Sequence, residues 1–183
     1  MAASRPSPSG GRLALIGLIA LLVAVDQGVK LVIARWGMGY SFPLVGDVLQ
    51  YYPTVNEKMT WGGNFIEVLS VPAVAIALNV LAIALALSAY AFYRASVEKP
   101  GKAAAFVFAV GLAGCVCGLV DRVFWGGSLD FLQVPGAFVF DVKDCYLSVS
   151  LVVFVALALA HGDAFDLRAY GSYLASRLRR DAK

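Results

Sequence analysis

Residues 121–131 read DRVFWGGSLDF, and residues 140–144 read FDVKD. These two stretches place four aspartates and an arginine between two segments that are apolar enough to span a bilayer. An ionisable group at membrane depth costs roughly 3 to more than 10 kcal/mol. Charges kept at such a cost indicate a function, and the rest of the chain is organised around them.

The composition is that of a polytopic membrane protein. Of the 183 residues, 60% are hydrophobic and 15% are charged, and the mean hydropathy is +0.77. Soluble domains carry about 25% charged residues. Lipid offers no partner to an unpaired backbone group, so a spanning segment of roughly 20 residues is a helix. We predict an all-α membrane protein with four transmembrane helices, at about residues 13–33, 71–92, 103–120 and 139–160.

The two ends of the chain are predicted to lie outside this domain of residues 13–160. Residues 1–12 are rich in Ser, Pro, Gly and Arg, which favours a disordered cytoplasmic tail. No small-x-small cleavage site follows the first apolar segment, so we expect a retained helix rather than a cleaved signal peptide. Residues 161–183 combine an apolar stripe with several arginines and are predicted to form a cytoplasmic amphipathic tail.

The positions of the basic residues predict the orientation. Ten of the fifteen lysines and arginines fall on the side that carries both termini. The positive-inside tendency places that side in the cytoplasm, so the connection at 121–144 faces outwards. We expect membrane phospholipid as a neighbour and a monomeric chain. No basic surface interleaved with aromatic residues suits nucleic acid.

Residues 37–64 have a different character from the apolar segments. Val48 to Val55 is β-branched and aromatic, yet too short and too polar to span a membrane. It is typical of a short strand pair, and we predict a small extracytoplasmic β-cradle between the first two helices. The loop is either structural or in contact with substrate, and Asn56 near a Gly-Gly pair slightly favours the second role.

Several kinds of catalytic site can be set aside. His161, the only histidine, is predicted to lie on the cytoplasmic side, so a catalytic triad or a zinc site is not expected. Cys115 and Cys117 point about 200° apart on a helix and do not share a metal ion. We predict no cofactor and no metal.

A pair of carboxylates remains as the chemistry available. When two acids lie close together, one holds a proton while the other deprotonates water. Asp121 is most simply explained as an ion pair with the adjacent Arg122. Spacing alone does not identify the catalytic pair: one member is Asp130 or Asp121, and the other is Asp144 or Asp141. A proton or ion path would use the same residues.

Asp26 and Lys30 add a second charged pair, at the end of the first apolar segment. Their spacing of four places them on one helix face. The simplest interpretation of the charges alone is a helix end whose lysine extends to water.

These residues together resemble the bacterial lipoprotein signal peptidases, or signal peptidase II, over about residues 12–160. The matching blocks are DQGVK at 26–30, Asn56, the stretch at 121–131, and Phe140 with Asp144. The resemblance implies that Asp130 and Asp144 are the catalytic aspartates. The supporting residues are then Asn56, Arg122, Asp26 and Lys30, with Asp121 as a brace and Asp141 as an anomaly.

The resemblance also implies an activity. It is the cleavage of lipid-modified lipoprotein precursors just before the diacylglyceryl-modified cysteine, in the bacterial inner membrane, with the active site towards the outer face. The alternative is a divergent, non-catalytic relative that binds lipoproteins or another membrane partner.

The chain departs from the family pattern at four positions. Gly118 and Asp141 stand where the family has asparagine, Lys143 stands for alanine, and Lys58 stands for a loop glycine. We therefore expect weak, narrowed or altered activity. Asp141 and Lys143 are expected to pair and to change the electric field at the catalytic aspartates.

Overall fold

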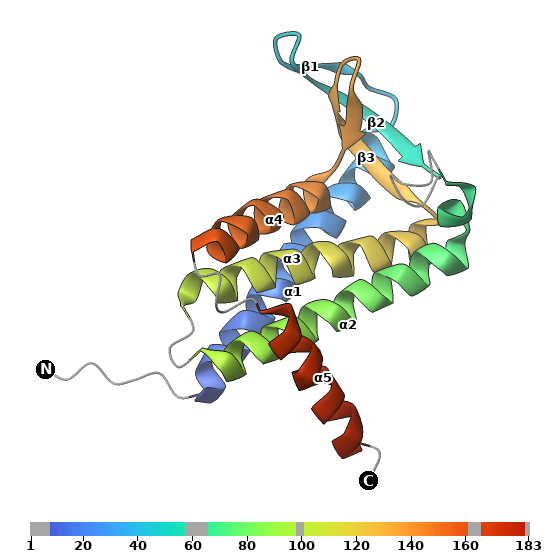
Figure 1. Cartoon of the computed structure of the whole chain (residues 1–183). Coiled ribbons are helices and arrows are strands. Elements are labelled where there is room, and N and C mark those ends of the chain that lie inside the picture. Colours follow the sequence, from blue (N-terminus) through green and yellow to red (C-terminus); the bar gives the residue numbers. More distant parts are fainter. Residues whose placement is uncertain (1–7, 58–65, 98–100, 161–165, 182–183) are drawn as a thin grey trace, which may run out of the picture.

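The computed structural model describes residues 8–57, 66–97, 101–160 and 166–181. The described part is a bundle of long helices with a small sheet at one end (Figure 1). This arrangement confirms the predicted fold class. The helices are α1 (Pro8–Trp36), α2 (Pro72–Ser96), α3 (Lys102–Val120), α4 (Val142–Ala160) and α5 (Leu167–Asp181), with short turns η2 (Glu67–Ser70) and η3 (Asp121–Trp125).

Four of the described helices are long and apolar enough to cross a membrane. These spans are Gly11–Trp36, Pro72–Ser96, Lys102–Trp125 and Val142–Leu159. Their outward surfaces carry large apolar side chains that suit hydrocarbon, such as Leu81 and Leu151. Helix α1 begins at Pro8, inside the segment predicted to be a disordered tail, and residues 1–7 lie outside the described residues.

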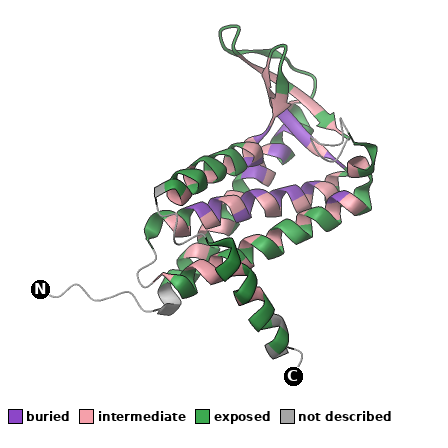
Figure 2. Cartoon of the chain, viewed as in Figure 1, coloured by how far each residue is buried: buried purple, intermediate pink, exposed green. Residues whose placement is uncertain are grey.

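Helix α3 is the centre of the bundle. Figure 2 shows buried residues gathered along α3, whereas α2 and α5 are largely exposed. A β-carbon at Gly114 would lie 2.8 Å from the Leu147 side chain on α4, so only glycine permits this close approach. The Ser150 hydroxyl of α4 donates to the Val107 carbonyl oxygen at 3.0 Å. Small residues on α3 thus allow α4 to pack closely against it.

The sheet joins two distant parts of the chain. Its antiparallel strands follow the order β1 (Phe42–Val45), β2 (Leu49–Asn56), β3 (Ser128–Val134) and β4 (Phe138–Phe140). The first two form the predicted strand pair between α1 and α2. The other two come from the connection between α3 and α4, where no strands were expected.

A small apolar core attaches the sheet to the helices. It consists of Ile33 from α1 with Leu129 and Phe131 from β3. Because side chains alternate along a strand, the residue between the last two, Asp130, lies on the opposite face of β3. The core therefore fixes the position of a strand that carries one of the predicted catalytic residues.

Helix α5 packs on the end of α2 that is remote from the sheet (Figure 1). The Phe92 ring of α2 lies 5.4 Å from the Tyr170 ring and 5.5 Å from the Tyr173 ring. The helical form agrees with the predicted amphipathic tail, whose location at a cytoplasmic leaflet stays a prediction. His161 lies outside the described residues.

Candidate active site

The end of α3 brings two aspartates to one place. The helix continues into the π-helical turn η3, which begins at Asp121. Gly126 then adopts φ of +66°, a left-handed conformation that lets the chain reverse into β3. A β-carbon at Gly127 would lie 2.7 Å from the carbonyl oxygen of Asn56 on β2. This tight reversal puts Asp130 beside the helix end that carries Asp121.

The start of α4 supplies two more aspartates in a reciprocal cap. The backbone N–H of Asp144 donates to an Asp141 carboxylate oxygen at 3.1 Å, and the backbone N–H of Asp141 donates to Asp144 at 3.2 Å. This is the pattern of a capping box, in which two side chains satisfy two free N–H groups at a helix start. The cap holds the Asp144 side chain in a single orientation.

The two predicted catalytic aspartates come together. One carboxylate oxygen from each of Asp130, Asp141 and Asp144 lies within 4.8 Å of the others. Asp130 is only 4% exposed, whereas 40% of the Asp144 side chain is exposed. Both line a cavity of about 260 Å³, together with Asn56, Asp121, Arg122, Gly127, Ser128, Phe138, Val139, Phe140 and Lys143.

Asp130 is held by neighbours on two strands. It accepts from the Ser128 hydroxyl at 2.7 Å and from the Asn56 amide at 3.4 Å. The register of the sheet explains the second contact, because Asn56 is paired with Ser128 across β2 and β3. Burial raises the pKa of Asp130, against the opposing effects of the Lys143 charge and the Ser128 hydrogen bond.

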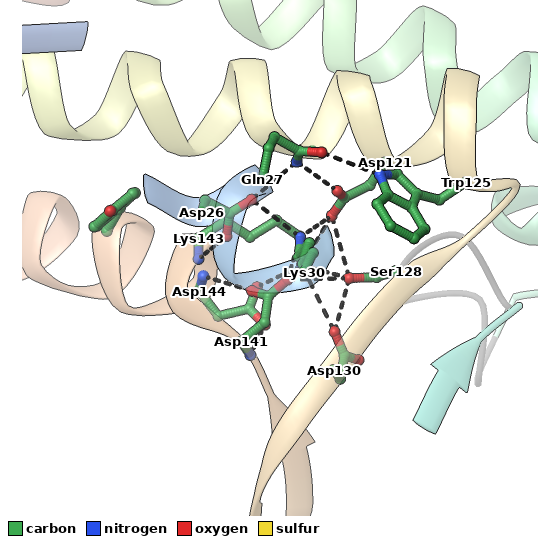
Figure 3. A network of polar contacts seen from close by, with 12 residues as sticks. Asp26, Gln27, Lys30, Asp121, Trp125, Ser128, Asp130, Asp141, Lys143 and Asp144 are labelled. Carbon is green, nitrogen blue, oxygen red and sulfur yellow. Dashed lines mark hydrogen bonds and ion pairs between the residues drawn. The ribbon is translucent and has the colours of Figure 1, made fainter. Parts of the chain in front are cut away.

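Lys30 lies at the centre of a buried network of charges (Figure 3). Its ammonium lies 2.6 Å from Asp121, 2.6 Å from Asp141 and 3.1 Å from Asp26, and its side chain is fully buried. The interpretation of Lys30 as a lysine that extends to water is therefore wrong. Three carboxylates stabilise the buried ammonium in place of the water molecules that would solvate it at the surface.

Gln27 extends this network. Its amide nitrogen donates to both Asp26 and Asp121 at 3.0 Å, and its oxygen accepts from the Trp125 indole at 3.0 Å. Polar contacts thus link α1 to both ends of η3. The network adjoins the cavity, which Asp121 lines.

Asp121 and Arg122 do not form the predicted ion pair with each other. Within the described residues, the ion-pair partners of Asp121 are Lys30 at 2.6 Å and Lys143 at 3.6 Å. Arg122 instead donates to the Gly118 carbonyl oxygen at 2.7 Å. Adjacent residues on a helix do not face each other, which is the physical reason for the separation.

Lys143 occupies the middle of the acidic group. Its ammonium lies 2.7 Å from Asp141, 3.5 Å from Asp144 and 3.7 Å from Asp130. It also donates to the Ser128 hydroxyl at 2.7 Å. The expected pairing of Asp141 with Lys143 is present. Burial would raise the pKa of Asp141, but the charges of Lys143 and Lys30 outweigh burial and lower it.

Three carboxylates this close also meet the distance requirement of a cation site. The Lys143 ammonium contacts all three of them, at 2.7 to 3.7 Å. A positive charge of the chain itself therefore stands where a bound cation would have to be.

Two residues at the site were not predicted from the sequence. Ser128 lies between Asp130, Asp141 and Lys143, with its hydroxyl oxygen within 3.2 Å of each. Asn79 of α2 is the second. With its amide oriented to satisfy both groups, it donates to the Cys115 carbonyl oxygen at 2.9 Å and accepts from Arg122 at 2.8 Å.

Asn79 lies beside the position where the family pattern has an asparagine. A β-carbon at Gly118 would lie 3.0 Å from the end of the Asn79 amide and 2.8 Å from Arg122. The missing side chain at 118 thus leaves room that an amide from α2 fills. A single asparagine within an apolar helix was the available sequence signal, because polar groups at membrane depth mark functional positions. Lys58, the fourth departure, lies outside the described residues.

The fold and the site together define a class: a polytopic membrane protein with a cluster of carboxylates at the junction of its helices and a small sheet. Residues 18–160 match the family described as Signal peptidase (SPase) II, and the chain belongs to that family. It is therefore a membrane peptidase, and family membership assigns it to lipoprotein signal-peptide processing in general.

Solved structures support the fold independently. Two structures, both described as a bacterial membrane enzyme, are each 18% identical in sequence to this chain. One has a TM-score of 0.67 and the match covers 84% of this chain, and the other has a TM-score of 0.62 and 80% coverage. Each match covers 92% of the solved chain. Among curated proteins, none matches.

Proposed function

We propose that the protein is an intramembrane aspartyl endopeptidase. It removes the signal peptide from lipoprotein precursors just before the diacylglyceryl-modified cysteine. The observation that carries this proposal is the approach of Asp130 and Asp144, from β3 and α4, to within 4.8 Å beside one cavity. Two carboxylates at that separation act on one water molecule.

The environments of the two aspartates differ in a way that suggests their roles. Asp144 is the more exposed, and a backbone N–H holds it in place, so it acts as the base that takes a proton from water. The water oxygen bonds to the scissile carbonyl carbon and the carbonyl oxygen becomes negative. When the C–N bond breaks, the leaving nitrogen takes the proton from Asp144. Asp130, on β3, positions the water.

The cavity lining suits an extended peptide next to a lipid. Phe138, Val139 and Phe140 give it apolar surface, while Asn56 and Arg122 supply amide and guanidinium donors. The buried Nε of Arg122 has no hydrogen-bond partner among the described residues. A buried donor of this kind favours an acceptor such as a substrate carbonyl oxygen.

The orientation follows from the same charge pattern as in the sequence. Both termini lie in the cytoplasm of a bacterium, the site faces the outer side of the inner membrane, and the chain acts as a monomer among phospholipids. The separation of the site from α5 along the bundle supports this arrangement (Figure 1).

The substrate assignment is tested with the purified protein in phospholipid vesicles. A precursor with its diacylglyceryl group and the same precursor without it are supplied separately, and mass spectrometry locates the cut. We expect cleavage of the lipid-modified form only, immediately before the modified cysteine. Equal cleavage of both forms, a cut elsewhere, or no cleavage at all would contradict the proposal.

The non-catalytic alternative required Asp130 and Asp144 to be too far apart to share a proton. Their separation of under 4.8 Å removes that argument. No contact in the described residues favours the alternative.

The room beside Gly118 leads to a prediction about the family residue. Gly118→Asn should lower cleavage about tenfold instead of improving it, because the new side chain displaces Arg122 and Asn79. The double variant Asn79→Ala with Gly118→Asn should recover most of the loss, because the added amide then has space. Initial cleavage rates of the three proteins measure this. A higher cleavage rate in Gly118→Asn than in wild type would show that Asn79 does not take the place of the family asparagine at position 118.

A further inference from the structure

Lys143 lies close to both proposed catalytic residues. Its ammonium lies 3.5 Å from Asp144 and 3.7 Å from Asp130, on the wall of the cavity. An ammonium has three N–H donors. Asp141 and Ser128 each lie 2.7 Å from it and take two of them. One donor is left for the two aspartates or for an oxygen atom that enters the cavity.

The surrounding charges hold Lys143 in this position. From α4 and the residue before it, Asp144 and Asp141 face it, and Asp130 faces it from β3. Asp121, the first residue of η3, lies 3.6 Å from the ammonium. Two charged groups of α1 lie near it: Asp26 accepts the backbone N–H of Lys143 at 3.0 Å, and Lys30 shares Asp141 with it. The guanidinium of Arg122 lines the same cavity.

This arrangement differs from a pair of acids that share a proton. Two carboxylates share a proton because both cannot ionise at short range without a compensating charge. Here Lys143 supplies that charge within 3.7 Å of each. That charge opposes the effect of burial and favours the ionised form of each carboxylate, so the pair has less need to hold a shared proton. A group other than a shared proton can then act on the carbonyl oxygen.

We propose that the Lys143 ammonium, held by Asp141 and Ser128, is a further catalytic residue that stabilises the negative carbonyl oxygen during cleavage. This inference rests on the proposed peptidase function. Asp144 takes the proton of the water, and the C–O bond forms. The electron pair of the carbonyl moves to its oxygen, beside Lys143. When the carbonyl re-forms, the C–N bond breaks and the leaving nitrogen takes the proton from Asp144, so Lys143 and both aspartates return to their starting states.

A mechanism that depends on Lys143 and one that depends on a proton shared by the two aspartates have different pH profiles. A pair that shares a proton loses activity on the alkaline side when that proton leaves, in the titration range of carboxyl groups, about 5. A lysine keeps its charge to about pH 10. Activity that depends on Lys143 therefore persists into alkaline solution. On the acid side both mechanisms lose activity, because protonation removes the base.

The test is the pH profile of precursor cleavage by three proteins in the same vesicles. Wild type should keep its activity to about pH 9. In Lys143→Ala the cleavage rate at pH 9 should fall by at least about 100-fold. The alkaline limb of its pH profile should move down by about 3 pH units or more, because the aspartate pair must then share a proton. Lys143→Arg keeps the charge and should keep the wild-type limb. An alkaline limb that is unchanged in Lys143→Ala, or higher activity of that variant at pH 9, would overturn the proposal.

The chain offers a control and a readout that does not require cleavage. Lys102→Ala, at the exposed start of α3, should match wild type throughout. Lys143→Ala should fold, because Asp141 keeps its contact with Lys30 at 2.6 Å. Infrared spectra recorded over a pH series should show a protonated carboxyl that persists to higher pH in Lys143→Ala than in wild type and that disappears with Asp144→Asn.

The two readouts separate the inference from the function on which it rests. Cleavage by a wild-type protein whose protonated carboxyl persists to the same pH as in Lys143→Ala would overturn the role of Lys143 and leave the peptidase intact. Absence of cleavage by wild type would overturn the peptidase function and the inference with it.

Discussion

Asp130→Asn and Asp144→Asn are each expected to lower precursor cleavage by about 1,000-fold or more. Acid–base groups contribute about 100- to 10,000-fold to catalysis, and the proposed mechanism uses Asp144 as the base and Asp130 to position the water. The amide has almost the same shape as the carboxylate, so both variants should remain folded. Initial rates with the lipid-modified precursor measure the loss.

Asp47→Asn is the matched control for these two substitutions. Asp47 lies in the exposed turn between β1 and β2, outside the cavity lining. It should leave the cleavage rate unchanged. Rates within tenfold of wild type for Asp130→Asn or Asp144→Asn would remove these residues from the chemistry.

Lys30→Met is expected to destabilise the folded protein by about 3–5 kcal/mol. The substitution leaves Asp26, Asp121 and Asp141 without the ammonium that lies within 3.1 Å of all three. Buried carboxylates without a compensating charge carry a large desolvation cost. Unfolding in a detergent titration, followed by the fluorescence of the tryptophans, measures the change.

A second substitution shows whether charge is the cause. Asp121→Asn added to Lys30→Met removes one of the three carboxylates that have lost the Lys30 ammonium and should restore part of the lost stability. Lys102→Met, at an exposed helix start, should be neutral. A loss in Lys30→Met below about 1 kcal/mol would mean that the network does not stabilise the fold.

Much of the fold followed from the sequence because the physics of the bilayer is simple. Four apolar segments of spanning length have no alternative to helix in lipid. The strands β3 and β4 were missed for a related reason. They are short, and the pairing of β3 with β2 is a contact between residues about 75 positions apart, as between Thr54 and Asp130, which local patterns do not reveal.

The candidate site was only partly predictable. The resemblance to a family singled out Asp130 and Asp144, and the structure brings them together. The partners of Lys30 and Asp121 were not predictable, because an ammonium at a helix end pairs with whatever the tertiary packing brings near it. The reciprocal cap of Asp141 and Asp144 had a visible signal, two acids three residues apart before an apolar helix.

The departures from the family pattern at residues 118, 141 and 143, which the structure describes, form a consistent set. Asp141 and Lys143 bring opposite charges and pair with each other, so together they add no net charge to the cluster. The amide of Asn79 fills the room beside Gly118. The expected weakening or narrowing of activity stays a prediction, and the initial rate on a standard lipid-modified precursor measures it.

The central claim is that Asp130 and Asp144 act as one catalytic unit, and a double-variant cycle of cleavage rates tests it most directly. Wild type, Asp130→Asn, Asp144→Asn and the double variant are compared on the lipid-modified precursor. Groups that act as a unit are not additive, so the double variant should lose hardly more than the worse single variant. Losses that multiply, or a wild-type protein that cleaves no precursor, would contradict the claim.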